Sequence, residues 1–199
     1  SGYSLGTSDG RSIILDMAFD VAFADGARTV TPKPTFEEPA ALDEGGKRPI
    51  LRLAHAAGPD GPLTVAQVGP ADLIVRSVVG KKALVGAARR EESLRTLQAP
   101  IQGEISALRL DGRGEDLFLG TSTGQILHYD LRDRDNPKSV EAVSVTSKPG
   151  MAVSVLTFLL GDRTLVVGDA AGGVSTWQMV PPPSGGEKRL TRIYEFQGH

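Results

Sequence analysis

The sequence contains no cysteine among its 199 residues. Disulfide bonds, thiolate metal sites and a cysteine nucleophile are therefore excluded. The redox state of the compartment stays open, because a chain without cysteine suits an oxidising compartment and a reducing one equally. Aromatic residues are scarce at 5 %, but hydrophobic residues as a whole reach 40 %, which is enough to form a packed core.

Long hydrophobic runs and an excess of either charge are also absent. The most apolar run, MAVSVLTFLLG at 151–161, is far shorter than the roughly 20 residues that a membrane helix needs. The alternation of Val153 and Val155 with Ser154 predicts a buried strand there instead. The 22 basic and 24 acidic residues leave a net charge of −2, so no basic face is offered to nucleic acid.

What the sequence does contain is a repeat. ISALRLDGRGEDLFLGTSTGQILHYDLRD at 105–133 and VSVLTFLLGDRTLVVGDAAGGVSTWQMV at 153–180 each have three apolar strands separated by glycine-bearing turns. The two stretches match at an offset of 48 residues, as from Gly120 to Gly168. The same offset aligns two further pairs, Gly124 with Gly172 and Tyr129 with Trp177.

A third copy, SLGTSDGRSIIL at 4–15, places Leu15 where the other two have an aromatic residue, and a weaker copy lies at 50–77. Self-similarity at about 50 residues, with three strands and a fourth between units, is typical of a β-propeller. The pattern resembles WD40 repeats, but Trp-Asp survives only as Tyr129-Asp130. We therefore predict an all-β, propeller-like fold with degenerate four-stranded blades.

The expected organisation is one domain over residues 1–199. The fourth strands are predicted at 92–99, 139–146 and 189–197, and loops at 31–49 and 181–188. Residue propensities at 81–94 also allow a short helix, but we expect an extra strand followed by a polar turn, because Val85-Gly86 interrupts the helix pattern. The predicted parts are a blade end at 1–19, blades at about 50–80, 92–133 and 139–180, and the start of another blade at 189–199. Because a closed propeller needs at least about four blades, we expect a fragment of a larger propeller.

The glycine turns GTSDG, GTSTG and GDAAGG allow two interpretations. Backbone amides in such turns can bind phosphate, or glycine can supply the positive φ of a hairpin turn. Repetition at one register favours the second interpretation. Gly80-Lys81-Lys82 is similar to the end of a P-loop, but Val75 stands where glycine is needed and Lys82 where Ser or Thr is needed, so no nucleotide site is predicted.

No catalytic, cofactor-binding or metal site is predicted from the remaining polar residues. His55, His128 and His199 are scattered, and His128 alternates with Leu127, which favours an outer face. The charged runs Arg89-Arg90-Glu91-Glu92 and 130–135 are interpreted as a solvated turn and a polar tip. Trp177 and Tyr129 are expected to pack between blades.

Three stretches resemble the large soluble insert of proteobacterial phosphate ABC transporter permeases. They are SLGTSDGRSIILDMAFDVAFADGARTVTPKP, AARREESL and VLTFLLGDRTLVVGDAAGGVSTWQMV. The resemblance implies an inner-membrane subunit whose insert faces the periplasm. The implied partners are a second permease, ATPase subunits and a periplasmic phosphate-binding protein. Transport residues of that family lie in membrane helices, so none is carried over to this sequence.

The expected function is that of a non-catalytic docking or scaffold surface without a cofactor, because a repeat scaffold offers a broad surface with loops on two faces. A free-standing WD40-like interaction scaffold unrelated to transport is the alternative. A propeller enzyme would need carboxylates or histidines from several blades at one end, and these are not repeated at matching positions. A sensor of phosphate itself stays open.

Overall fold

The structure is a computed structural model that describes residues 2–36, 38–42, 48–59, 61–81, 89–159 and 161–196. Every regular element in these ranges is a β-strand, and the strands form four sheets, here called A to D in chain order. Sheet A holds β1 (Gly2–Gly6), β2 (Arg11–Ala24), β3 (Ala27–Phe36) and β4 (Ala40–Ala41); sheet B holds β5 (Arg52–Ala56), β6 (Leu63–Gln67), β7 (Asp72–Lys81) and β8 (Arg89–Gln98); sheet C holds β9 (Ile105–Leu110), β10 (Asp116–Thr121), β11 (Gln125–Asp130) and β12 (Lys138–Ser144); sheet D holds β13 (Val153–Phe158), β14 (Leu165–Asp169), β15 (Val174–Val180) and β16 (Arg189–Phe196).

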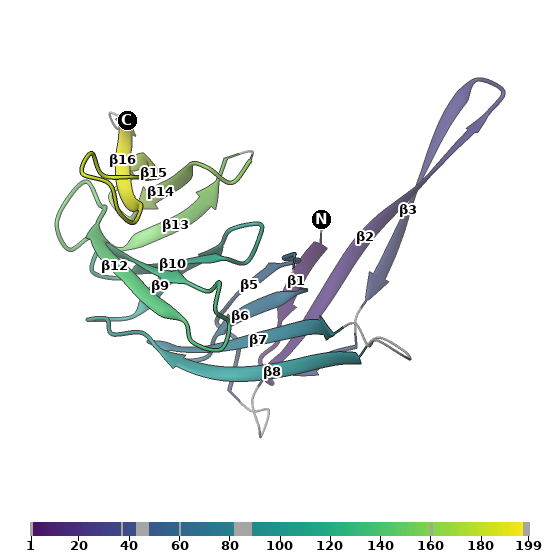
Figure 1. Cartoon of the computed structure of the whole chain (residues 1–199), viewed down its shortest axis with the longest axis horizontal. Helices are drawn as coiled ribbons and strands as arrows, with labels where there is room; N and C mark the ends of the chain where they lie inside the picture. Colours follow the sequence, from purple (N-terminus) through teal and green to yellow (C-terminus); the bar gives the residue numbers. More distant parts are fainter. Residues whose placement is uncertain are drawn as a thin grey trace.

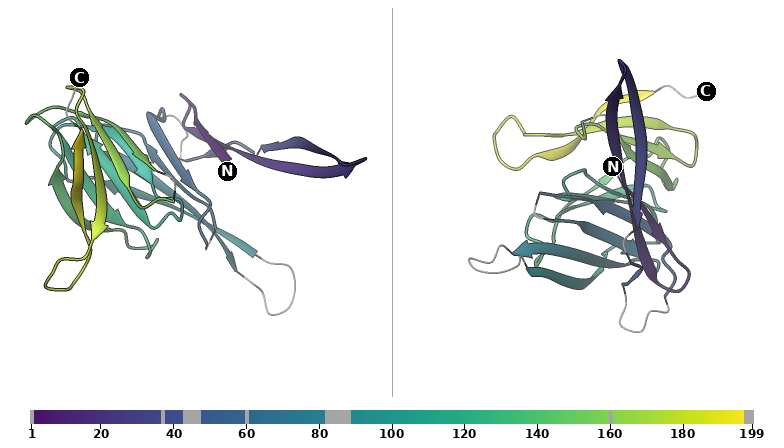
Figure 2. Two further views of the ribbon diagram at one scale, coloured as in Figure 1. Left: turned by 90° about the horizontal axis from the view of Figure 1, so that it is seen from above. Right: turned by 90° about the vertical axis from the view of Figure 1, so that its right-hand side faces the viewer.

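Sheets B, C and D are antiparallel meanders in which each strand pairs with the next one along the chain. In sheet A, β2 pairs with β1 on one side and with both β3 and β4 on the other. Contacts between neighbouring sheets run through strands near their inner side: β1 contacts β5, β5 contacts β9, and both β9 and β10 contact β13. The sheets therefore fan out around a shared inner side, as Figures 1 and 2 show.

The boundaries of the sheets differ from those expected from the sequence. The segments expected to open a following blade close the preceding one instead: β8 pairs with β7, β12 with β11, and β16 with β15. The sheets thus span 52–98, 105–144 and 153–196. The repeat pattern was ambiguous here, because a strand between two units can pair with either neighbour, and the connections on its two sides are similar in length.

Two segments expected to be irregular are strands. Of the loop predicted at 31–49, residues 31–36 belong to β3 in spite of Pro32 and Pro34, since β3 is an edge strand where missing N–H groups break no ladder bond. The charged run at 89–92 begins β8 and is not a turn. The strand and polar turn predicted for 81–94 fall largely on residues 82–88, which lie outside the described residues.

The hydrophobic core is divided into layers between neighbouring sheets. Tyr129 and Trp177 are 2 % and 4 % exposed, and each belongs to a different layer, which confirms that the aromatic residues of the repeat are buried in the core. The sheet A–B layer is the smallest of the three, with Leu42, Ala66, Val68 and Ile74 as its buried members. The buried strand predicted at 151–161 is half correct: Val153 is fully buried in β13, but Val155 is 52 % exposed on a face of sheet D that none of the described strands covers.

The glycine turns have the geometry expected of hairpins. Gly10, Gly124 and Gly172 have φ values of 81°, 88° and 83°, in the left-handed region that favours glycine. This confirms that these glycines serve the turns between the second and third strands of the copies.

Two of these glycines form a matched pair for a stability test. We expect Gly172→Ala to lower the free energy of unfolding by about 1 kcal/mol, the cost of a positive φ with a side chain. A Cβ on Gly172 would meet nothing within 4 Å, whereas one on Gly124 would lie 2.7 Å from the Met151 carbonyl oxygen. Gly124→Ala should therefore cost about 1–2 kcal/mol more in a denaturant melt. Equal losses for the two variants would contradict the crowding at Gly124.

Strands β2 and β3 extend beyond sheet A as a two-stranded ribbon, which projects from the rest of the molecule (Figure 1). The ribbon is closed by the two-residue turn Asp25-Gly26, in which both residues have positive φ, as a type I′ turn requires. Because side chains alternate along a strand, one face of the ribbon is apolar and the other is polar or small. The apolar face carries Met17, Phe19, Val21, Phe23, Val30, Pro32 and Pro34, and one charged residue, Arg28, lies on it opposite Phe23.

Candidate functional site

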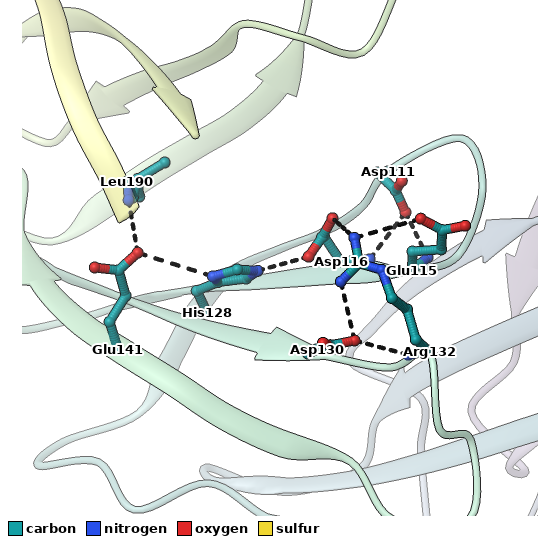
Figure 3. A network of polar contacts seen from close by, with 8 residues as sticks. All are labelled: Asp111, Glu115, Asp116, His128, Asp130, Arg132, Glu141 and Leu190. Atoms are coloured by element: carbon teal, nitrogen blue, oxygen red, sulfur yellow. Dashed lines mark hydrogen bonds and ion pairs between the residues drawn. The ribbon is translucent and has the colours of Figure 1, made fainter. Parts of the chain in front are cut away.

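The most developed polar cluster lies where sheet C packs against sheet D. Its side chains come from sheet C and the turns that join its strands, and sheet D contributes one backbone N–H group (Figure 3). The members are Asp111, Glu115, Asp116, His128, Asp130, Arg132, Glu141 and Leu190. We call this set the C–D network.

His128 is the centre of the C–D network. Its Nε2 lies 2.8 Å from a carboxylate oxygen of Asp116, and its Nδ1 lies 3.9 Å from Glu141. The ring stacks on Phe118 with 4.7 Å between centroids and an interplanar angle of 6°. His128 is 2 % exposed, so the prediction of an outer face is wrong. Alternation with Leu127 could not decide this, because both faces of sheet C are covered by neighbouring sheets.

Glu141 connects the two sheets. Its Oε1 accepts a hydrogen bond of 2.6 Å from the backbone N–H of Leu190, which lies in β16. A buried backbone N–H needs such a partner, since an unpaired one costs about 1–3 kcal/mol. The contact series Asp116, His128, Glu141 and Leu190 therefore links β10, β11 and β12 to sheet D.

Arg132 closes the other side of the network. Its guanidinium lies 3.1 Å from Asp130, 3.2 Å from Asp116 and 3.4 Å from Glu115. Partial burial would lower the pKa of Arg132, but the charges of these carboxylates outweigh burial and raise it. Burial would likewise raise the pKa of Asp116, but the hydrogen bond and charge of His128, together with Arg132, lower it. Asp116 is thus held ionised between two basic side chains.

Asp111 has a different environment. Its Oδ1 accepts backbone hydrogen bonds from Glu115 at 2.7 Å and from Asp116 at 3.0 Å, which fixes the turn between β9 and β10. Burial, with a smaller contribution from the Asp116 charge, raises the pKa of Asp111 in spite of these bonds. Its position in the turn makes it a structural residue.

Two hollows of about 410 Å³ each lie beside the C–D network. Asp116, Met179 and Lys188 line both. Their other charged lining residues carry both signs, including Arg163 and Asp162. A surface of mixed charge does not select an anion or a cation by charge alone.

The chemistry available to the C–D network is limited by its geometry. Asp116 and His128 have the residue types of an acid–base pair. Both residues line one of the two hollows. The His128 ring, however, is only 2 % exposed and is in contact with Phe118 and Asp116. The carboxylates and the histidine of the described network come from one sheet, whereas a propeller enzyme was expected to gather them from several. The arrangement acts as a link between two sheets.

A second link joins sheets C and D through Asp169, at the end of β14. The carboxylate accepts hydrogen bonds from the Ser147 backbone N–H and hydroxyl, each at 2.7 Å, and from the N–H groups of Ala171 and Gly173 at 2.9 and 2.8 Å. Ser147 lies in the connection between β12 and β13. The sequence did not identify this link, because it does not show that Asp169 and Ser147 are neighbours.

The other candidate residues from the sequence are not brought together. His55 lies in sheet B, where its Nδ1 is 3.0 Å from Thr64, and His199 is outside the described residues. Among the residues that are described, no group of three or more His, Asp or Glu could hold a metal ion. Gly80 lies in β7, and Lys82 is outside the description.

The predicted polar tip at 130–135 makes several contacts with other segments. Arg95 forms an ion pair of 2.6 Å with Asp135, and Arg134 donates to the carbonyl of Gly61 at 3.0 Å. These contacts join sheets B and C. In the second charged run, Glu92 pairs with Arg76 at 2.8 Å across β7 and β8.

The role of Glu141 can be tested with paired substitutions. We expect Glu141→Ala to lower the free energy of unfolding by about 1–2 kcal/mol, because the Leu190 N–H loses its acceptor. Glu141→Gln keeps an acceptor oxygen and should lose less than half as much. As a control, Glu195→Ala removes an exposed ion pair with Arg192 and should change stability by less than about 0.5 kcal/mol in the same melts. Equal losses for the Ala and Gln variants would show that the acceptor is not what matters.

Four-stranded antiparallel sheets that pack face to face around a shared inner side define the class: the chain has the β-propeller fold. It is similar to the crystal structure of the β-propeller domain of Cps50 (Swd1) from Myceliophteria thermophila, with 15 % identity, a TM-score of 0.56, and coverage of 98 % of this chain and 55 % of the other. It is also similar to apo AztD from Citrobacter koseri, with 14 % identity, a TM-score of 0.54, and coverage of 99 % and 44 %. The chain thus spans about half the length of these two structures.

Neither a family model nor a curated protein matches the sequence. Within the described residues, no helical segment has the length and apolarity needed to span a bilayer.

Proposed function

We propose that the chain is a non-catalytic propeller segment that provides a docking surface in a phosphate-import ABC transporter, as the extramembrane domain of a permease subunit. The resemblance of 4–34, 87–94 and 155–180 to the insert of such permeases supports the transporter assignment. In this role the domain faces the periplasm, and the full-length protein resides in the inner membrane. Its partners are the second permease, the ATPase subunits and the periplasmic phosphate-binding protein.

The observation that carries the docking role is the apolar face of the ribbon formed by β2 and β3. Phe19 is 57 % exposed and Phe23 is 75 % exposed, although both are large and apolar. Contiguous exposed apolar side chains of this size are typical of interaction sites. The opposite face carries Asp20 and Lys33, which form an ion pair and keep that side polar.

The ribbon is suited to recognition through its face and not through its edge. In a two-residue hairpin the two residues that flank the turn, here Ala24 and Ala27, form a hydrogen-bonded pair. Along the ribbon, hydrogen-bonded and non-hydrogen-bonded pairs then alternate. Pro32 and Pro34 therefore occupy positions whose N–H groups would point away from β2. Their lack of N–H donors blocks the addition of another strand along this edge. A partner must then cover the apolar side chains, and we assign this place to the phosphate-binding protein.

Calorimetry of the chain with phosphate, followed by the phosphate-binding protein of the same transporter, tests the proposal. We expect no heat with phosphate alone and a binding isotherm once the binding protein is added. The double variant F19S/F23S should weaken binding by at least about tenfold, because two exposed aromatic anchors are lost. The control Asp20→Ser, on the opposite face of the ribbon, should bind normally.

Other outcomes would favour other functions. Heat with phosphate alone would favour a sensor. No binding, together with a reading frame that lacks membrane helices, would favour a free-standing WD40-like scaffold. Unchanged binding by F19S/F23S would place the contact elsewhere and remove the role given to the ribbon.

A further inference from the structure

Sheet A and sheet C have equivalent strands, and their equivalent residues differ in exposure. The strand glycines Gly6 and Gly120 align in the repeat, so β1 corresponds to β10. Tyr3 and Leu5 then correspond to Leu117 and Leu119. The two leucines are fully buried, whereas Tyr3 is 66 % and Leu5 is 54 % exposed.

The cause of this difference is the neighbouring sheet. Leu117 and Leu119 belong to the core layer that they share with Leu63 and Val65 of sheet B. In sheet A, the face that packs toward sheet B carries Ser12 and Ile14, which are 1 % and 2 % exposed. Tyr3 and Leu5 lie on the opposite face and therefore point away from sheet B. The face of sheet A that carries Tyr3, Leu5, Ile13 and Leu15 is here called the A face; Tyr3 pairs with Leu15, and Leu5 with Ile13.

The inner edge of sheet A differs in the same way. In sheet C, β10 pairs with β9, the innermost strand, on the side away from β11. In sheet A, β1 pairs with β2 only, and no strand of the described residues lies along its other edge. The A face is thus uncovered beside a strand edge with free backbone hydrogen-bonding groups.

The opposite end of the fan shows the same feature. Ile126 of β11 is fully buried against sheet D, whereas Val174, at the offset of 48 residues in β15, is 38 % exposed. Tyr194 and Phe196 of β16 are 56 % and 49 % exposed. Val174 pairs with Phe196, so these side chains share one apolar face with Val155, here called the D face.

We propose that the A face and the D face are blade-to-blade interfaces, and that further blades of the same polypeptide cover them, with an innermost strand of one blade pairing along β1. The interface would continue the one already repeated between sheets A and B, B and C, and C and D. The chain covers 55 % and 44 % of the propeller chains that it resembles, which leaves room for such blades. This proposal rests on the fold and is independent of the phosphate-transport role.

A second copy of this chain fits the two faces less well. Its D face could cover the A face, but sheet D already contains a complete set of four strands, β13 to β16. None of these would be free to pair with the edge of β1. A blade from the same polypeptide can supply both the apolar face and the strand.

The absence of native cysteine allows a direct test by labelling single cysteines with a maleimide. Leu5→Cys reports on the A face, Val174→Cys on the D face, and Lys148→Cys in an exposed loop is the control. In the 199-residue chain, we expect Leu5→Cys to react about as fast as the control. In the protein encoded by the complete reading frame, both face variants should react at least about tenfold more slowly than Lys148→Cys, because reaction then requires local opening.

Each other outcome overturns the proposal. A reading frame that encodes no further blade sequence leaves nothing in the same polypeptide to cover the faces. Equal reactivity of all three variants in the complete protein would show that the faces stay open. Protection that appears in the 199-residue chain and rises with its concentration would show that a second copy is the occupant.

Discussion

Trp177→Ala should lower the free energy of unfolding by about 3–5 kcal/mol, the usual loss when a large buried side chain is truncated. Trp177 is 4 % exposed and belongs to the layer between sheets C and D, together with Phe118 and Ile126. Its indole N–H donates to the Ser175 hydroxyl at 2.8 Å, so burial leaves no unsatisfied donor. Truncation would leave a cavity in this layer.

A denaturant melt of the variant measures this loss. The matched control is Phe23→Ala, since Phe23 is 75 % exposed on the ribbon and its truncation should cost less than about 1 kcal/mol. A loss below about 1 kcal/mol for Trp177→Ala would mean that the ring is not buried between sheets. The offset of 48 residues that aligns Trp177 with Tyr129 would then be in error.

Asp169→Ala is expected to cost about 2–4 kcal/mol, because several hydrogen bonds to one buried carboxylate are lost together. Asp169 is 7 % exposed, and the backbone N–H groups of Ser147, Ala171 and Gly173 depend on it. Asp169→Asn keeps one acceptor oxygen and should lose about half as much. Ser147→Ala, which removes only the hydroxyl bond, should lose least. Equal stability of Asp169→Ala and the unsubstituted chain would contradict the link between sheets C and D.

The same residue gives stability a defined dependence on pH. Burial would raise the pKa of Asp169, but the hydrogen bonds from Ser147, Gly173 and Ala171 outweigh it and lower the pKa in the folded state. Because the folded-state pKa is lowered, the ionised carboxylate of Asp169 adds to the free energy of unfolding at pH values above the unfolded-state pKa. This contribution is lost as pH falls through the folded-state pKa. We expect unfolding free energy to fall as pH drops below about 4.

Asp169→Asn isolates this contribution from those of other carboxylates, such as Asp116. Melts of both proteins between pH 7 and pH 3 should show a difference in stability that is constant near neutrality and shrinks in acid. A difference that does not change with pH would show that the charge of Asp169 contributes nothing.

Much of the fold could be predicted from the sequence. The offset between Gly120 and Gly168 identified the repeat, the turn glycines were assigned correctly, and Tyr129 and Trp177 were placed in the core. These predictions depend on local signals, namely strand alternation and the need for glycine at positive φ. Such signals act within one hairpin and survive in a degenerate repeat.

The predictions that were wrong concern features that depend on contacts between segments distant in the sequence. The sequence could not show that β8, β12 and β16 close the preceding sheets. Nor could it show that His128 faces sheet D, since both faces of a blade are buried and alternation no longer separates inside from outside. The ribbon was a missed local signal: Asp25-Gly26 between alternating residues is typical of a type I′ hairpin.

The most direct test of the proposed docking role is hydrogen exchange of the chain with and without the phosphate-binding protein. The proposal predicts slower exchange in the ribbon, residues 17–34, and little change in the strands of sheets C and D. Exchange that is unchanged everywhere, or slowed only around the C–D network, would contradict it.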